Sequence, residues 1–259
     1  MKLTQLFCGS VLCCAIASPS FADVTLKSKA SATGAMAASI AGEKIEYVKG
    51  AKMRTDQTTG AGKKMTTIVD ASTKQLISID HDKKEAQVMD FKGVAASMSR
   101  IGIENISVSI TPAGTTRQIA GKTCEVYDLK IAVPIDMGKM KMTMAMTGPH
   151  CLVKNGPGHA DLQAFFKASA EGGLISDPAQ AKAQPAVAKA LADLQKKMSE
   201  LGVPFASEMT IQMQGEGPMA EMMKKAGANT ISTEVTEVSV APLAASLFEV
   251  PEGYTVTKR

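Results

Sequence analysis

Two cysteines and a row of methionines are the residues in this chain whose types and spacing point to chemistry. Five cysteines are present, and three of them, Cys8, Cys13 and Cys14, lie within the first 22 residues. The remaining pair, Cys124 and Cys151, is the even count that favours a disulfide over a metal site or a nucleophile in an oxidising compartment. We predict a Cys124–Cys151 disulfide, with two free buried thiols as the alternative.

The methionines alternate with polar or small residues, as the side chains of a half-buried strand do. One row comprises Met140, Met142, Met144 and Met146, and a second row repeats the pattern with Met209, Ile211 and Met213. Methionine is flexible and polarizable, which suits a surface that accommodates varied apolar groups. Three interpretations are open: ordinary core packing, an apolar cavity for a lipid or acyl chain, and thioether coordination of Cu(I).

One hairpin register relates the methionines to the cysteines. If the chain folds back about Met137-Gly138, paired residue numbers sum to 275. Met142 then faces Val133, and the same sum places Cys124 opposite Cys151 on the other face of the hairpin. A slip by one residue would move the apolar set to the wrong face, so we predict this register.

The first 22 residues have the features of a secretory signal peptide. Lys2 provides the positive start, an apolar run extends from Leu6 to Ala17, and Ser20-Phe21-Ala22 is a small-x-small cleavage site. The run is too short for a membrane span. We expect cleavage after Ala22 and a periplasmic or secreted mature domain, residues 23–259, without a transmembrane segment.

The composition argues against nucleic acid as a partner. The mature chain carries a net charge of +3, because Lys2 is lost with the signal peptide. This charge is spread along the chain, without a basic block or interleaved aromatic residues. Tryptophan is absent, so the core must be built mainly from Ala, Val, Ile, Leu and Met.

Signatures of catalysis are missing from the sequence. It contains no G-x-S-x-G, no H-E-x-x-H and no paired-cysteine zinc spacing. Gly121-Lys122-Thr123 imitates the end of a phosphate-binding loop, but Thr116 stands where that loop requires glycine. The histidines, His81, His150 and His159, are scattered. We therefore expect no catalytic residues, no metal and no cofactor.

Short strands separated by polar turns are expected over most of the chain, and their spacing of about ten residues favours an antiparallel meander. One helix is predicted over 91–101, and a second short helix over 219–226. The tail 248–254 is expected to be extended and to seal a sheet edge. The predicted strands are 24–33, 44–48, 52–58, 64–70, 75–80, 86–89, 104–110, 116–119, the two arms of the hairpin, 207–214 and 230–240.

An insert rich in Ala, Gly and Pro, at about 155–203, contains two amphipathic helices. Apolar residues share one face of each helix, and Gly172-Gly173 and Gly202 end them. We predict an α+β fold in which a curved antiparallel sheet, an incomplete barrel, has its concave apolar face covered by these helices. The residues predicted to close over the methionine rows are Phe165, Phe166, Leu191 and Leu194.

Four short segments resemble a family of exported bacterial domains of unknown function, which are similar to the Lol-type periplasmic lipoprotein carriers and receptors. The segments are 47–54 (YVKGAKMR), 67–70 (TIVD), 119–124 (IAGKTC) and 248–254 (FEVPEGY). The resemblance implies an incomplete barrel around an apolar cavity with a helical lid. It also implies that Arg54 helps to hold the lid closed. The chain departs from those carriers in its hairpin cysteines, its methionine rows and its helical insert.

The leading hypothesis is a non-enzymatic periplasmic protein that binds or carries an apolar small molecule, a lipid or an acylated peptide, with envelope proteins as further partners. Two alternatives are a methionine-rich Cu(I)-handling protein and a structural envelope protein whose cavity is filled by core side chains. The surroundings of the methionine rows distinguish the three hypotheses. A carrier requires an open cavity beside them, a copper-handling protein requires a metal site, and a structural protein requires a filled core.

Overall fold

The computed structural model describes residues 23–34, 37–99, 102–103, 106–136, 141–174, 185–215, 222 and 227–258. The predicted signal peptide, Met140 and all but one residue of the helix expected over 219–226 lie outside these ranges. All structural statements below concern the described residues.

The first part of the chain folds into a meander of six strands, and its boundaries lie within two residues of the expected ones. The pattern of alternating apolar residues was therefore a good guide to this region. The strands are β1 (Val24–Ala32), β2 (Gly42–Lys49), β3 (Lys52–Thr59), β4 (Lys64–Asp70), β5 (Gln75–Asp80) and β6 (Glu85–Asp90).

Six further strands continue the sheet. The two strands expected over 104–110 and 116–119 are a single strand, β8, which has an irregularity between Pro112 and Thr116. These strands are β7 (Gly102–Ile103), β8 (Ser107–Ile119), β9 (Lys122–Asp136), β10 (Lys141–Val153), β11 (Val203–Gly215) and β12 (Asn229–Val240).

The helix expected from residue 91 and the two expected in the insert are present, whereas the short α1 and η2 were not expected from the sequence. None of the described helices is both long and apolar enough to span a bilayer. They are α1 (Ala37–Ile40), α2 (Phe91–Ser99), α3 (His159–Gly172), α5 (Pro185–Leu201) and the 3-10 turn η2 (Ala245–Phe248).

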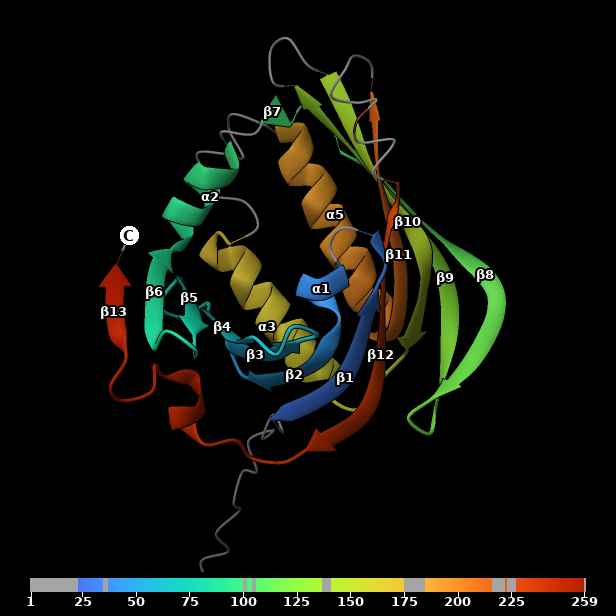
Figure 1. Cartoon of the computed structure of the whole chain (residues 1–259). Coiled ribbons are helices and arrows are strands. Elements are labelled where there is room, and N and C mark those ends of the chain that lie inside the picture. Colours follow the sequence, from blue (N-terminus) through green and yellow to red (C-terminus); the bar gives the residue numbers. More distant parts are fainter. Residues whose placement is uncertain are drawn as a thin grey trace, which may run out of the picture.

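The strands form one open sheet of 13 strands (Figure 1) in the order β13-β6-β5-β4-β3-β2-β1-β12-β11-β10-β9-β7, with β8 also paired to β9. Neighbouring strands are antiparallel, except that β13 (Thr255–Lys258) is parallel to β6. The expected combination of an antiparallel sheet with helices is confirmed in this coarse form.

The C-terminal tail differs in detail from the expectation. Residues 248–254 were expected to be the extended segment that seals an edge, but the edge strand is β13, which follows them. The segment before β13 instead packs its apolar side chains onto the sheet. Its Pro251 and Gly253 disfavour a continuous strand, because proline lacks an N–H and Gly253 adopts a positive φ of 82°.

The register predicted for the hairpin is wrong by two residues. Paired residues of β9 and β10 sum to 277, so Met142 faces Ile135 and Met144 faces Val133. The last described pair before the connection is Asp136 with Lys141, which sets the centre of the hairpin one residue later than was assumed. A shift of two preserves the face of every side chain, because successive residues of a strand alternate between faces.

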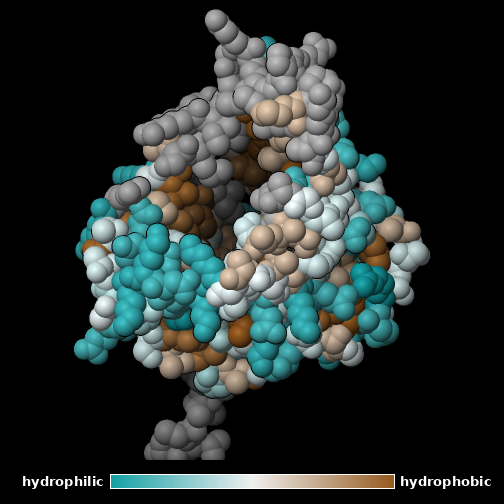
Figure 2. All heavy atoms as spheres, viewed as in Figure 1, coloured by the Kyte–Doolittle hydropathy of each residue, from teal (hydrophilic) through white to brown (hydrophobic). Residues whose placement is uncertain are grey.

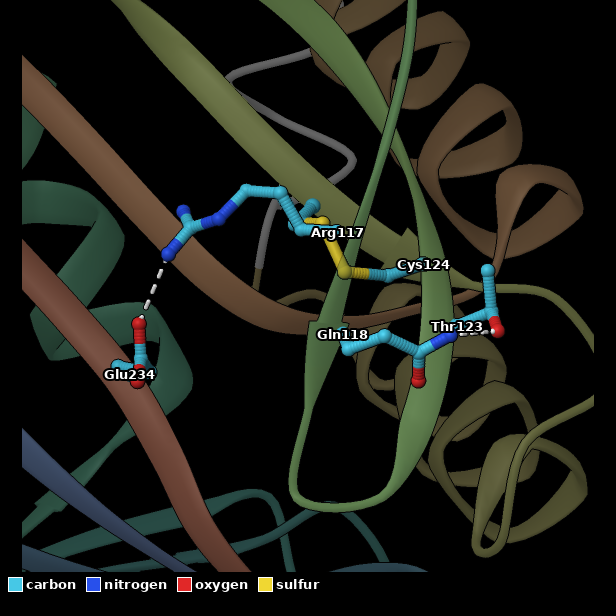
Figure 3. Close-up of a disulfide and its surroundings, with 6 residues drawn as sticks. Arg117, Gln118, Thr123, Cys124 and Glu234 are labelled. Carbon is cyan, nitrogen blue, oxygen red and sulfur yellow. Dashed lines mark hydrogen bonds and ion pairs between the residues drawn. A yellow bond between two sulfur atoms is a disulfide. The ribbon is translucent and has the colours of Figure 1, made fainter.

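The Cys124–Cys151 disulfide is present, although the two cysteines are diagonal neighbours. Cys151 is directly opposite Val126, and the two cysteine Cα atoms are 5.3 Å apart, within the usual range for a disulfide. In Figure 3 the side chain of Arg117 starts near the disulfide and extends away from it to Glu234, to which it is paired at 3.0 Å. Both cysteines are almost fully buried.

Apolar side chains cover both faces of the sheet near β3–β5. Val69 packs against the main core, which includes Leu162 and Phe165 of α3. The adjacent Ile68 belongs to a second core with Phe248 of η2. Because neighbouring residues in a strand point to opposite faces, α3 covers one face of this region and the C-terminal segment covers the other.

We predict that the disulfide stabilises the folded protein substantially. It closes a loop with a sequence separation of 27, which in the chain-entropy model corresponds to about 3–4 kcal/mol. The double variant Cys124→Ser/Cys151→Ser should lose about this free energy of unfolding in urea titrations, and reduced wild type should behave similarly. Two alkylatable thiols in the folded, oxidised wild type would contradict the pairing.

Candidate functional site

An apolar groove lies between α3 and α5, where the chain enters β11. Its volume is about 380 Å³, within the range of small-molecule sites. Figure 2 shows a hollow with hydrophobic residues on its visible wall, and the groove itself is located by its lining residues. The apolar residues that line the groove are Leu162, Phe166, Leu191, Leu194, Met198 and Val203.

Local sequence fixes the two helices that form the groove. Gly173, in the left-handed conformation, ends α3, and its N–H and that of Leu174 bond to carbonyls of the last turn, as in a Schellman motif. Pro185 occupies the first position of α5, where its missing N–H is not needed. Gly202 follows the last residue of α5, as the sequence indicated.

Three side chains join α3 to α5 along one side of the groove. His159 and Gln163, one turn apart on α3, both donate to the carbonyl of Ser199 at 2.8 and 2.6 Å. Gln195 of α5 donates in return to the carbonyl of Phe166. The Ser199 carbonyl lies in the last turn of α5, where carbonyls lack a partner within the helix, so these bonds satisfy it.

The apolar face of α5 is only partly buried. Among the 17 residues of this helix Val187 alone is classed as buried, whereas Leu191, Leu194 and Met198 keep part of their surface accessible along the groove. An amphipathic helix normally buries its apolar face against the fold. The groove is therefore apolar surface that the described part of the chain leaves unfilled.

The described residues that were predicted to bind a ligand are divided between four environments, the last of which is a row across the sheet. Phe166, Leu191 and Leu194 lie together in the groove. Phe165 is 3% exposed and belongs to the main core. Met142 is buried beside a separate small hollow at the ends of β9, β10 and β11.

The other methionines form a continuous row across the sheet. Met144 directly faces Met213, Met146 faces Ile211, and Met209 faces a residue of β12. Residues that face each other across strands share one face of the sheet. All five are half-buried, and the row is not part of the lining of the groove.

Arg54 of β3 contacts the C-terminal segment. Its guanidinium donates to the carbonyl of Leu247 at 2.7 Å and to Asp56 at 2.8 Å. Leu247 packs with the second core, on the face opposite to α3. A lid-holding role for Arg54 stays a prediction, and the bond to Leu247 ties down the C-terminal segment.

A chain of hydrogen bonds beside Arg54 was not foreseen from the sequence. Because a carboxylate only accepts, the buried Thr66 hydroxyl donates to Asp56 and in turn accepts from Nε2 of His81 at 2.8 Å. Nδ1 of His81 then accepts from the Tyr254 hydroxyl, also at 2.8 Å. Tyr254, the partner of His81, lies 173 positions away in the sequence, and no local pattern signals such a contact.

The three histidines remain apart, as their spacing suggested. His81 joins the C-terminal segment to β4, and His159 joins α3 to α5. Burial lowers the pKa of His150 and keeps the ring neutral at physiological pH. Within the described residues, no group of three or more His, Cys, Asp or Glu side chains is arranged to hold a metal ion.

No protein-family model matches the sequence, and no curated protein matches it significantly.

We predict that the Tyr254 hydroxyl stabilises the attachment of the C-terminal segment. The variant Tyr254→Phe removes its bond to His81 and should lower the free energy of unfolding by about 1 kcal/mol. The control is Tyr127→Phe, because the Tyr127 hydroxyl bonds only to the exposed Glu125; this change should cost less than about 0.5 kcal/mol. Equal losses of unfolding free energy in the two variants would show that the Tyr254–His81 hydrogen bond adds nothing to stability.

Proposed function

We propose that this protein is a non-enzymatic binding or carrier protein of the periplasm, whose ligand is an apolar small molecule, a lipid or an acylated peptide. The observation that carries this proposal is the apolar groove between α3 and α5. Its lining combines leucine, phenylalanine and methionine, which grip apolar groups without demanding one shape.

The proposal includes the finer architecture expected from the sequence, a half-barrel whose concave apolar face is covered by helices. The pairing of the strands across the sheet supports it. Met209 faces Ile231, and Ile231 faces Ala32 of β1. Ala32 lies on the same face of β1 as the buried Val24 and Leu26, because residues of equal parity share a face. The methionine row thus continues the face that carries the main core.

The incomplete burial of the apolar face of α5 supports a helical cover that can move. Carrying requires that a ligand enter and leave, and elements that move come from the less tightly packed parts of a fold. The polar side chains that join α3 to α5 hold the two helices together as one unit. This arrangement agrees with the resemblance to Lol-type carriers, and envelope proteins would deliver or receive the ligand.

We predict that the delipidated, exported protein binds the neutral fluorescent probe N-phenyl-naphthylamine in the groove. The variant Leu194→Gln replaces apolar lining with an amide and should weaken binding about tenfold or more, since burying a leucine side chain contributes about 1.5–3 kcal/mol. Fluorescence titration measures the affinity.

The matched control is Val256→Gln on β13, an exposed valine remote in sequence from the groove, which should leave probe affinity unchanged. Thermal unfolding of both variants verifies that they fold. If the wild-type protein binds no apolar probe, the carrier function is excluded and a structural role becomes the better account.

Cu(I) handling is a second candidate, favoured by one observation. Met144 directly faces Met213, with Met142 the next residue on the same face. Opposed Cβ atoms lie about 4.5–5.5 Å apart, close enough for two flexible thioethers to meet at one ion. Thioethers are soft ligands that select Cu(I).

Competition with a chromophoric Cu(I) chelator tests this candidate. We expect a copper-handling protein to take up one Cu(I), and Met144→Leu/Met213→Leu to abolish the uptake at a stability cost below about 1.5 kcal/mol per near-isosteric change. Met222→Leu is the control, because Met222 is 60% exposed and lies outside the row. Uptake that survives the double change, or no uptake by wild type, would reject the copper candidate.

A further inference from the structure

The groove between α3 and α5 opens beside a second hollow of different character. This hollow, of about 490 Å³, shares four residues with the groove, so the two adjoin. The shared residues are Gln163, Phe166, Gln195 and Ser199. A molecule with its apolar part in the groove would extend its other end past the polar side chains among them, those of Gln163, Gln195 and Ser199.

The second hollow is lined by charged side chains that the groove lacks. Lys167 of α3 and Lys196 of α5 line it from the two helices, together with Glu171. Ala170 and Ala192, also in its lining, have side chains too short to obstruct it. Two ammonium groups against one carboxylate leave an excess of positive charge at this end.

The one ion pair recorded at the hollow is weak. Lys167 and Glu171 are 4.0 Å apart, at the limit for a salt bridge, and their side chains are 78% and 68% exposed. Exposed pairs of this kind contribute little, so an incoming anion meets little competition for Lys167. The nearby carboxylate of Asp193 is paired with Lys189 at 2.7 Å and is not part of the lining.

We propose that the ligand of this protein is an anionic amphiphile, whose hydrocarbon chain lies in the groove and whose carboxylate or phosphate lies between Lys167 and Lys196. This inference rests on the proposed carrier function. It adds the chemical class of the ligand and its orientation: the head group faces the solvent-accessible end, where Lys167 and Lys196 line the hollow.

Displacement of bound N-phenyl-naphthylamine by two amphiphiles of equal chain length tests the proposal. Dodecanoate is anionic at neutral pH and dodecanol is neutral, so their ratio of affinities isolates the head group. Wild type should bind dodecanoate about fivefold more tightly, the factor expected for two weak exposed charge contacts. Added salt should reduce this preference by screening.

Charge variants at the hollow test which side chains cause the preference for dodecanoate over dodecanol. Lys167→Gln/Lys196→Gln should abolish the preference for dodecanoate without weakening dodecanol binding. Glu171→Gln should increase the preference, because it removes the competing carboxylate. Lys27→Gln is the control, since Lys27 is on β1, pairs with Glu237 and does not line the hollow, and it should leave the ratio unchanged.

The outcomes separate the two proposals. Equal binding of dodecanoate and dodecanol by wild type would overturn the anionic class and leave the carrier function standing. A preference that persists in the double lysine variant would overturn the assigned position of the head group. If neither amphiphile binds and the probe does not bind either, both the inference and the carrier function fall together.

Discussion

The pairing of β1 with β12 connects two parts of the sheet that are distant in sequence. β1 pairs along its whole length with β12 on one side, and from Val24 to Ala30 with β2 on the other. The meander β1–β6 and the strands β9–β12 therefore become one open sheet. Without this contact the two halves would be separate sheets.

Because strand side chains alternate between faces, a sheet with apolar residues on both faces needs two covers. This chain provides them from different places: α3 packs on the main core, and the C-terminal segment packs on the second core. Polar contacts of Arg54 and Tyr254 add to the apolar packing of the second cover, whereas α3 packs on the main core through the apolar Leu162 and Phe165. The covers thus differ in how they are held.

That difference bears on the proposed function. Polar contacts with fixed geometry define one position for the C-terminal segment, so this side of the sheet has a permanent cover. The α3–α5 unit is joined internally by side-chain hydrogen bonds, while the apolar face of α5 stays partly open. A ligand would complete the packing of α5, which is how a binding protein can be stable when empty and more stable when loaded.

The sequence by itself determined the local elements. Periods of two and near four residues predicted most strands and helices, because burial on one face imposes those periods, and Gly173 marked the end of α3 because it adopts a positive φ. The partner of Cys124 followed from elimination, since one other cysteine lies outside the predicted signal peptide. The sequence predicted which face of the hairpin each residue occupies but not its exact cross-strand partner, because a shift of two residues leaves every face unchanged.

Tertiary structure decided which of these elements meet. It placed Phe165 in the core and its neighbour Phe166 in the groove, although the sequence pattern assigns both to the same apolar face of α3. The reason is that α3 is covered on one side by the sheet and on another by α5, so adjacent residues are buried differently. It also brought Tyr254 to His81 and Arg54 to Leu247. These contacts depend on how a chain of 259 residues folds back on itself, and no local spacing encodes them.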